Sequence, residues 1–357
     1  MKNFKILDLF CGAGGFSAGL DSLDIFETVI GLDFNKDALS TFDYNFPNAT
    51  GIYGDITNKD IRSKVVTLAK QKGVNMIIGG PPCQGFSSKG KNLGMDDPRN
   101  FLFREYLSFV AELKPDIFII ENVKNLLTAV DGFFIKQIES EIKRIGYELD
   151  YGVLNASNFG VPQSRQRAII VGSKIGKIKL PKQTESKLTT VKDAIGDLAY
   201  LESGQGVFET IYTTTATSTY QKLMRKNSTQ LVNHIATNHK AIALEKLAMI
   251  PPGGSKADLP IDLHGKQQFK TTWGRLKWNE LSPTIDTRFD TPSNGTNSHP
   301  ELHRAITPRE AARLQSFPDD FVFLGKKTEI TKQIGNAVPP LMARAIGESI
   351  NEQIEDL

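Results

Sequence analysis

The segment GGPPCQGFS, residues 79–87, places a thiol directly after two prolines at the end of an apolar run. Proline fixes its own φ, so Pro81 and Pro82 hold the backbone rigid before Cys83. A thiolate is a strong nucleophile, and a cysteine presented in this way is a candidate for covalent catalysis. A buried structural cysteine is the alternative, but a core position needs neither Pro-Pro before the thiol nor Gln-Gly after it.

A carboxylate ends a second apolar run, DIFII, in the segment Glu121-Asn122-Val123. If both runs are strands of one sheet, Glu121 and Cys83 lie near the same edge of that sheet. From the residues alone, a helix cap or one half of an ion pair explains Glu121 equally well.

A glycine-rich turn, DLFCGAGG at residues 8–15, follows the first apolar run and opens a helix near Phe16. Glycines there let a ligand approach the backbone closely. The turn departs from the dinucleotide pattern GxGxxG, because Ser17 occupies the third glycine position. Asp33 and Asp55 end the next two apolar runs, where a carboxylate can bind a ribose hydroxyl or cap a helix.

These residues share a position, because each lies at or just past the end of a predicted strand. Short apolar runs alternate with helical patterns, which predicts an α/β sheet covered on both faces, with ligands outside the carboxyl ends of the strands. The predicted strands are 5–10, 28–33, 52–55, 76–80, 116–121, 149–155 and 167–172.

The composition is that of an ordinary globular protein, with 357 residues, 39% hydrophobic and 23% charged. This length predicts roughly two domains. A net charge of +3 demands no polyanionic partner for the whole chain. Two cysteines without zinc-ligand spacing predict neither a disulfide framework nor a metal site. With no signal peptide and no run of ~18 apolar residues, we expect a cytoplasmic protein without a membrane partner.

The segment 174–272 differs in composition from its surroundings. It is richer in Lys, Thr, Ser and Gln, and holds 14 basic and 8 acidic residues, a net charge of +6 that leaves −3 for the rest. We interpret it as part of a second, smaller domain. Its basic surface either contacts phosphates or is a solvated insertion with an incidental charge bias. After Pro308 a helical pattern resumes, and a final helix runs to about Gln353.

Six motifs occur in order along the chain: DLFCGAGG, GGPPCQGFS, ENV, QSRQR, ITPREAARLQSFPDDF and QIGNAVPP. Together they resemble the DNA (cytosine-5)-methyltransferases of prokaryotic or phage restriction-modification type. The resemblance implies the α/β fold of S-adenosylmethionine-dependent methyltransferases, a Rossmann-like mixed sheet flanked by helices, with a smaller target-recognition domain. The expected parts are a catalytic and cofactor-binding domain at 1–173, the target-recognition domain at 174–303, a hinge at 304–329 and a C-terminal return to the catalytic domain at 330–357.

The reaction that the resemblance implies gives Cys83 the role of nucleophile and Glu121 the role of acid. Carbon 5 of cytosine is a poor nucleophile until a thiolate adds to carbon 6, the role of Cys83. Glu121 would protonate or hydrogen-bond N3, which requires that it keep its proton. Arg165 and Arg167 of QSRQR would line the pocket, with Arg167 at the cytosine O2. Without the family, a surface basic pair on a strand is the preferred interpretation of these arginines.

Two neighbours complete the implied catalytic set. The base that removes the carbon 5 proton is not identified by the sequence, and a water near Asn122 or Pro82 is one suggestion. The target cytosine must swing out of the duplex to reach the thiol. The segment 87–99, with two lysines, is either a lid that closes over the flipped base or a disordered surface loop.

The cofactor implied by the resemblance is S-adenosyl-L-methionine, with no metal. Asp33 would bind its ribose, Phe34 its adenine face, and Asp55 and Ile56 its adenine edge. The full set of implied cofactor residues is Phe10, Gly12, Ala13, Gly15, Asp33, Phe34, Asp55, Ile56, Leu102, Asn336 and Ala337.

The implied partner is double-stranded DNA with a short recognition sequence. In the second domain, polar side chains would read base edges while lysines bind phosphates. Arg275, Arg288 and the turn 282–285 are candidate DNA contacts. We expect a monomer, and a cognate restriction endonuclease that acts separately is a further partner to test.

Three alternatives remain open. An RNA cytosine methyltransferase would share the cofactor site, but the basic segment suits duplex readout better. A catalytically dead DNA-binding relative would lack the nucleophile, which is present. A nicotinamide dehydrogenase disagrees with the glycine pattern and gives Pro-Pro-Cys no role.

Overall fold

The computed structural model describes residues 3–82, 101–128, 132–183, 188–265 and 270–355. The chain forms two compact units. Unit 1 consists of Met1–Phe159, Gln166–Glu185 and Val338–Leu357, and unit 2 of Gly160–Arg165 and Ser186–Ala337. No helix within the described ranges is long and apolar enough to cross a membrane.

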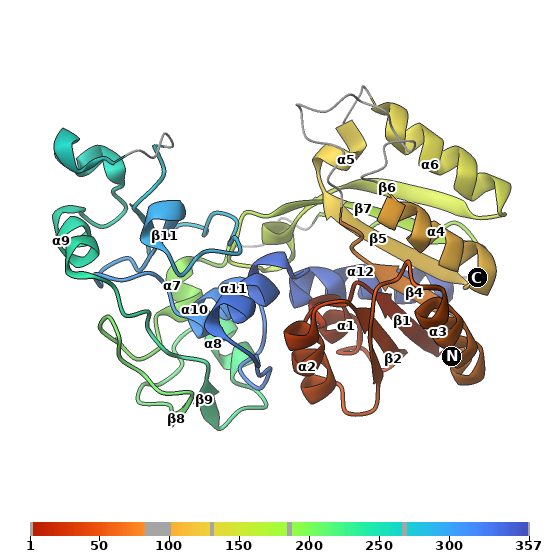
Figure 1. Ribbon diagram of the computed structural model, residues 1–357, viewed down its shortest axis with the longest axis horizontal. Coiled ribbons are helices and arrows are strands. Elements are labelled where there is room, and N and C mark those ends of the chain that lie inside the picture. The colour runs from red at the N-terminus through yellow and green to blue at the C-terminus, as the bar shows by residue number, and fades with distance from the viewer. Residues whose placement is uncertain (1–2, 83–100, 129–131, 184–187, 266–269, 356–357) are drawn as a thin grey trace. The chain divides into compact units, whose positions relative to one another are not determined.

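Unit 1 is built on a mixed sheet of seven strands within the described residues, in the order β3-β2-β1-β4-β5-β7-β6 (Figure 1). Strands β1 to β5 run parallel, while β7 is antiparallel to both of its neighbours. The strands are β1 Phe4–Leu9, β2 Phe26–Asp33, β3 Thr50–Tyr53, β4 Met76–Gly79, β5 Ile117–Val123, β6 Glu148–Asn155 and β7 Gln166–Ser173. All seven predicted strands are confirmed, with ends that differ by at most two residues.

The runs that form the central strands are continuously apolar because both faces of the sheet are covered. On one face, side chains such as Leu7 and Ile30 pack with Val65 of α3, Phe109 of α4 and Ile138 of α6. The helices of unit 1 are α1 Gly15–Leu20, α2 Lys36–Asn45, α3 Lys59–Lys72, α4 Phe101–Leu113, α5 Asn125–Thr128, α6 Phe133–Arg144 and α12 Pro340–Glu355, with the 3₁₀ turn η4 Ala156–Phe159.

Helices α1, α2 and α12 belong to the opposite face. A Cβ on Gly31 of β2 would lie 2.5 Å from the Phe42 ring of α2, so the ring needs a glycine there. A Cβ on Gly19 of α1 would lie 2.2 Å from the Pro340 carbonyl oxygen of α12. The C-terminal helix therefore packs closely on the first helix, and unit 1 is assembled from segments far apart in the chain (Figure 1).

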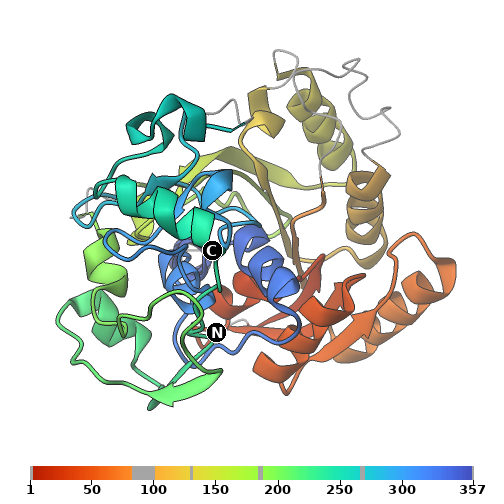
Figure 2. The same ribbon diagram turned by 60° about the vertical axis from the view of Figure 1, so that its left-hand side comes forward.

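Unit 2 has short regular elements joined by long irregular segments (Figure 2). Its longest helices begin at Ala241 and Lys327, and α10 begins with Pro308 behind the Thr307 cap, where the side chains of Thr307 and Glu310 form a capping box. Its elements are α7 Val191–Ile195, β8 Glu209–Ile211, α8 Thr219–Met224, β9 Gln230–Val232, α9 Ala241–Met249, η5 Lys256–Asp258, η6 Ile261–Leu263, β10 Gly274–Arg275, η7 Pro292–Asn294, β11 Thr296–Ser298, α10 Pro308–Leu314 and α11 Lys327–Asn336.

A buried ion-pair network holds these segments together. Arg313 contacts Asp197 and Asp319, each at 2.6 Å. Arg304 donates to both carboxylate oxygens of Glu310, each at 2.8 Å. All five side chains are almost completely buried. The network replaces part of the apolar core that long elements would supply.

The boundaries of the units differ from the expected parts. The segment 304–329, predicted as a hinge, lies inside unit 2, and four of the five members of the buried ion-pair network come from it. The C-terminal return to unit 1 begins at Val338, so residues 330–337 stay in unit 2. The short segment Gly160–Arg165 also belongs to unit 2, and Gln166 to unit 1.

Candidate active site

The glycine-rich turn after β1 is held by the carboxylate that ends β2. One oxygen of Asp33 accepts the Gly12 N–H at 2.8 Å, and the other accepts the Asn35 N–H at 2.7 Å. Phe10 and Gly12 both have left-handed backbone conformations, with φ of 63° and 53°. A Cβ on Gly12 would meet no atom within 4 Å, so the space over the turn is open. The backbone turn at residues 10–12 is therefore held in place and borders open space, and we call it the cradle.

Burial raises the pKa of Asp33, although the N–H groups of Asn35 and Gly12 lower it in part. Both oxygens of this carboxyl group therefore hold backbone N–H groups of the turn and of the segment after β2. The next residue, Phe34, is 68% exposed. A large aromatic side chain exposed beside a strand end is available to stack on a flat ligand.

A second carboxyl group, which sequence reasoning did not single out, lies below the turn. Asp8 of β1 is 2% exposed, and the Ser17 hydroxyl of α1 donates to it at 2.7 Å. Burial raises its pKa to about 8. The available signal was an acidic residue inside the otherwise apolar run ILDLF.

The remaining cofactor candidates of unit 1 differ in exposure. Asp55 follows β3, is exposed, and accepts the N–H and the hydroxyl of Thr57, which lower its pKa. Ile56 is buried, and Leu102 of α4 packs against the same core. Ala13 and Gly15 are buried beside the start of α1. Phe10 is partly buried and packs against the main core.

The carboxyl ends of β4 and β5 are tied together by an amide. The Asn122 side chain donates to the Pro81 carbonyl oxygen at 2.8 Å and accepts the Val123 N–H at 2.8 Å. A Cβ on Gly80 would lie 3.0 Å from a carboxylate oxygen of Glu121, so the segment before Pro81 passes close to this acid. Pro82 is exposed. The nucleophile candidate Cys83 and the predicted lid 87–99 lie outside the described residues.

Glu121 and Arg167 form an ion pair across neighbouring strands. Their Oε1 and Nε atoms are 2.9 Å apart, and the side chains are 10% and 16% exposed. Arg167 also donates to the Gln166 carbonyl oxygen at 2.8 Å. The antiparallel pairing of β5 with β7 brings the two together, because Val123 is the register partner of Arg167. The structure thus joins two predicted catalytic residues next to the Pro81 segment.

The remaining predicted site residues belong to unit 2. The Arg165 side chain is buried and donates to the carbonyl oxygens of Ile285, at 3.3 Å, and Gly335, at 2.9 Å. Asn336 ends α11 and is exposed, while Ala337 is half-buried.

The structure corrects one expected DNA contact. Arg275 is 3% exposed, and its guanidinium donates to four backbone carbonyl groups, those of Leu247, Ile250, His299 and Leu302. A guanidinium enclosed in this way cannot reach a phosphate, so Arg275 is a structural cross-link. Arg288 is exposed and pairs with Asp290 at 3.8 Å. In the turn 282–285, Ser282 and Ile285 are buried.

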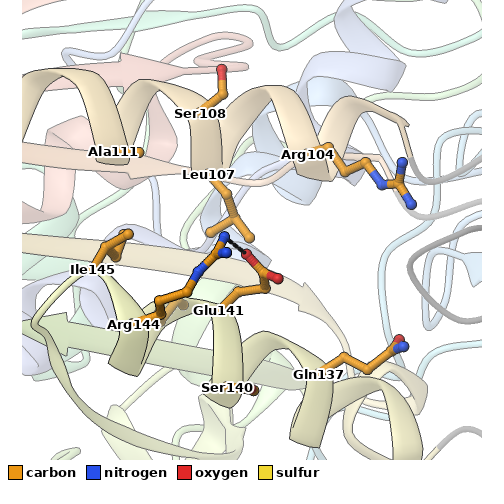
Figure 3. A pocket seen from close by; sticks show the side chains of 10 residues that line it. Arg104, Leu107, Ser108, Ala111, Gln137, Ser140, Glu141, Arg144 and Ile145 are labelled. Atoms are coloured by element: carbon orange, nitrogen blue, oxygen red, sulfur yellow. Dashed lines mark hydrogen bonds and ion pairs between the residues drawn. The ribbon is translucent and has the colours of Figure 1, made fainter.

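A separate groove lies between α4 and α6, with a volume of about 550 Å³ (Figure 3). Figure 3 shows its central charged pair, Arg144 and Glu141, directed at one another, with an N–O distance of 2.8 Å. Its walls come from helix surfaces and hold none of the strand-end residues described above. The groove is lined by Arg104, Leu107, Ser108, Ala111, Gln137, Ser140, Glu141, Ile142, Arg144 and Ile145.

The mixed sheet, the cradle after β1 and the acidic residues that end β2 and β3 define the fold of S-adenosylmethionine-dependent methyltransferases, as predicted. The model of the family of C-5 cytosine-specific DNA methylases matches residues 4–352, and the chain belongs to this family. Its activity is the sequence-specific methylation of carbon 5 of cytosine in DNA. The predicted enzyme class and the restriction-modification type are confirmed.

Relatives of the chain include bacterial type II methyltransferases. The type II methyltransferase M1.HphI of Haemophilus parahaemolyticus is 36% identical over 96% of this chain and 86% of its own length. M.DdeI of Desulfomicrobium norvegicum is 35% identical over 99% of this chain and 90% of its own length. Among solved structures, a DNA modification methyltransferase from an E. coli prophage has a TM-score of 0.80 and 25% identity, and covers 99% of this chain and 100% of its own.

Proposed function

We propose that Cys83 is the nucleophile of the methylation, and that Glu121 and Arg167 act with it on the target base. Arg165, expected beside them from the sequence, is enclosed by backbone carbonyl groups and supports the site without touching that base. The observation that carries this proposal is the Glu121–Arg167 ion pair beside the Pro81 segment that Asn122 anchors. Cys83 follows Pro81 by two residues in the sequence.

The chemistry follows from these groups. The Cys83 thiolate adds to carbon 6 of a cytosine flipped out of the duplex, and the ring electrons move toward N3. Glu121 donates a proton to N3, so carbon 5 gains the electron density of an enamine. After methylation of carbon 5, its proton passes to a base, with a water near Asn122 or Pro82 as the candidate. The C6–S bond then breaks, Cys83 leaves as a thiolate, and N3 returns its proton to Glu121.

Arg167 has two roles in this scheme. Its charge is permanent, so it favours the thiolate form of a nearby cysteine and can donate to the cytosine O2. Its ion pair with Glu121 also sets where the acid lies before the base enters. The entering cytosine would displace part of this pair, and Glu121 would then take up from solvent the proton that it donates to N3.

The residues around the cradle fit S-adenosylmethionine. The open space over Gly12 leaves room for a ligand against the backbone, and the exposed Phe34 ring offers an adenine platform. In this proposal Asp33 contacts the ribose, and Asp55 and Ile56 the adenine edge. The other contacts are those expected from the sequence: Phe10, Ala13, Gly15, Leu102, Asn336 and Ala337. The cofactor supplies an electrophilic methyl group.

The proposed partner is double-stranded DNA containing a short recognition sequence. Most of unit 2 comes from the basic segment, whose net charge of +6 favours a polyanion. We propose that the enzyme acts as a monomer in the cytoplasm of its host, and that any cognate restriction endonuclease acts separately.

A single experiment tests the nucleophile. A duplex with 5-fluorocytosine in the target site should trap a covalent adduct, because no proton at carbon 5 can be removed. Cys83→Ser should abolish the adduct and turnover but still bind the cofactor. Cys11→Ala is the matched control, since Cys11 is the other of the two cysteines in the sequence and is buried, and it should keep the adduct.

The target sequence comes from bisulfite sequencing of DNA from a methylation-free host that expresses the protein. One short motif methylated throughout would support the proposal. An adduct that survives in Cys83→Ser would contradict it, and methyl transfer only to tRNA would move the substrate to RNA.

A further inference from the structure

Two buried side chains hold consecutive carbonyl groups at the end of α11. The Gln315 amide donates to the Ile334 carbonyl oxygen at 2.7 Å, and Arg165 donates to that of Gly335 at 2.9 Å. The last carbonyls of a helix lack partners within the helix. Both donors are 0–1% exposed. The backbone that leads into Asn336 is therefore fixed by side chains from outside the helix.

The same donors belong to a buried polar chain. Gln163 donates to Gln315 Oε1 at 2.9 Å and to the Leu314 carbonyl oxygen at 3.0 Å. It accepts the Ile285 N–H at 2.9 Å, while Arg165 donates to the Ile285 carbonyl oxygen at 3.3 Å. Two residues of QSRQR thus connect three segments of unit 2.

The glycine before Asn336 shows how closely these segments fit. A Cβ on Gly335 would lie 2.4 Å from the Asp286 carbonyl oxygen and 2.7 Å from the Thr287 nitrogen. No side chain can be accommodated at such distances. The end of α11 therefore cannot move relative to residues 285–287 without breaking the contacts of Arg165 and Gln163.

We infer that Arg165 is a positioning residue for the cofactor contacts of Asn336 and Ala337. It acts through the Gly335 carbonyl group, whereas Arg167, two residues later, belongs to the pair with Glu121. The motif QSRQR then divides its arginines between two ligands, the first serving the cofactor and the second the target base. This inference rests on the proposed contact of Asn336 with S-adenosylmethionine.

The test measures S-adenosylmethionine binding by calorimetry on the full-length protein without DNA. Arg165→Lys keeps the charge but loses the fork that binds Ile285 and Gly335 together. Gln315→Met keeps the volume but loses the bond to Ile334. Each should weaken binding roughly tenfold, because a buried carbonyl group loses a hydrogen bond of about 1–2 kcal/mol. Thermal unfolding shows that each variant is folded at the assay temperature.

Arg275→Lys is the matched control, since Arg275 is also buried and bonded to carbonyl groups of unit 2, but not to those of α11. It should bind the cofactor with unchanged affinity. Asn336→Ala should weaken binding at least as much as Arg165→Lys. Arg167→Lys should leave cofactor affinity unchanged and reduce adduct formation with the 5-fluorocytosine duplex.

Wild-type cofactor affinity in Arg165→Lys and Gln315→Met, with weakened binding in Asn336→Ala, would overturn the inference but leave the cofactor site intact. Loss of the adduct in Arg165→Lys at unchanged cofactor affinity would likewise overturn it and assign Arg165 to the base. Unchanged affinity in Asn336→Ala would instead remove the proposed cofactor contact, and the inference with it.

Discussion

Unit 1 and unit 2 both bury carboxyl groups, but with different partners. In unit 1, Asp8 has a serine hydroxyl, and Asp21 accepts both the N–H and the hydroxyl of Thr28. In unit 2, Glu310 is bound by both terminal nitrogens of Arg304. Neutral donors offset little of the cost of burying a negative charge, whereas a guanidinium offsets much of it.

The pKa values follow this difference. Burial raises the pKa of Asp8 to about 8 and that of Asp21 to about 7. Burial also acts to raise the pKa of Glu310, but Arg304 overcomes it and lowers the pKa to about 2. Unit 1 can satisfy its backbone by strand pairing, while unit 2, with short elements, uses arginine forks such as Arg309, which donates to the Val232 and Phe321 carbonyl oxygens.

One pair in unit 1 follows the pattern of unit 2. Glu121 has Arg167 as a partner, and the pair lies at the proposed site of chemistry rather than in the core. This difference suggests that ion pairs serve structure in unit 2 and function in unit 1. The following predictions test that distinction.

The largest effect should come from breaking the network of unit 2. Arg313→Met leaves Asp197 and Asp319 buried without their shared cation, so we expect the free energy of unfolding to fall by about 3–5 kcal/mol. Denaturant titration at pH 7 measures it. Arg344→Met, which loses the exposed Glu348 and one hydrogen bond to the Ser22 hydroxyl, is the control. A loss below about 1 kcal/mol would show that the network does not hold unit 2 together.

The Glu121–Arg167 pair in unit 1 should matter more for activity than for stability. Glu121→Gln removes the proposed proton donor, so kcat should fall by about 10²–10⁴-fold. The free energy of unfolding should change by no more than about 1–2 kcal/mol, because the pair is not fully enclosed. Steady-state methylation and denaturant titration give the two values. A stability loss as large as that of Arg313→Met, with activity retained, would make this pair structural.

The two units should respond to pH with opposite signs. The folded-state pKa of Asp8 is about 8, above the usual value of 3.8, so its stabilisation is complete below 3.8 and is lost as the pH rises through about 8. Asp8→Asn removes this loss. Relative to wild type, it should gain about 1–3 kcal/mol of stability between pH 5 and pH 8. Asp55→Asn, at an exposed carboxylate, should show no such gain, and equal slopes in both variants would contradict the assignment.

As the pH falls below 7, unit 2 should lose stability before unit 1 does. Burial lowers the pKa of His299 to about 4, and its ring nitrogen Nδ1 accepts the N–H groups of Glu301 and Leu302. The stability that this neutral ring contributes is present above pH 6.5 and is lost as the pH falls through about 4. Amide exchange protection in α10, corrected for intrinsic rates, should therefore fall between pH 7 and pH 5 by about 1–2 kcal/mol. His299→Asn should reduce this fall, and a fall of the same size in that variant would exclude the histidine.

The smallest effect should come from an exposed pair. Lys332 pairs with Glu329 at 2.7 Å on the surface of α11. Lys332→Ala should change the free energy of unfolding by about 0.5 kcal/mol or less. A larger change, measured by the same denaturant titration, would mean that ion pairs stabilise unit 2 regardless of burial.

The sequence was sufficient for the strands of unit 1 and for placing the candidate site residues at or near their ends. Runs such as MIIG and AIIVG are apolar on both faces, so they indicate buried strands directly, and the chemical residues were found at their ends. The insertion of β7 between β5 and β6 could not be predicted, because strand order depends on long-range pairing. This order is what places Arg167 beside Glu121.

The environment of each arginine could not be predicted from the sequence. Arg165 and Arg167 are separated by a single residue. Arg165 nevertheless bonds to backbone carbonyl groups of unit 2, while Arg167 pairs with Glu121 of unit 1. Arg275 was expected at the DNA and is enclosed by carbonyl groups. A guanidinium satisfies either environment, so its residue type does not distinguish them.

The membership of Gly160–Arg165 in unit 2 has a consequence for the exchange of unit 2 between related chains. A recombination event that transfers only the long segment Ser186–Ala337 would leave Gln163 of one parent to meet Gln315 and Ile285 of the other. A functional chimera must therefore transfer the short segment as well, or keep all three partners compatible. Under the proposal that unit 2 reads the DNA, the segments that would be inherited together are two separate stretches of gene, and crossovers between them should be selected against.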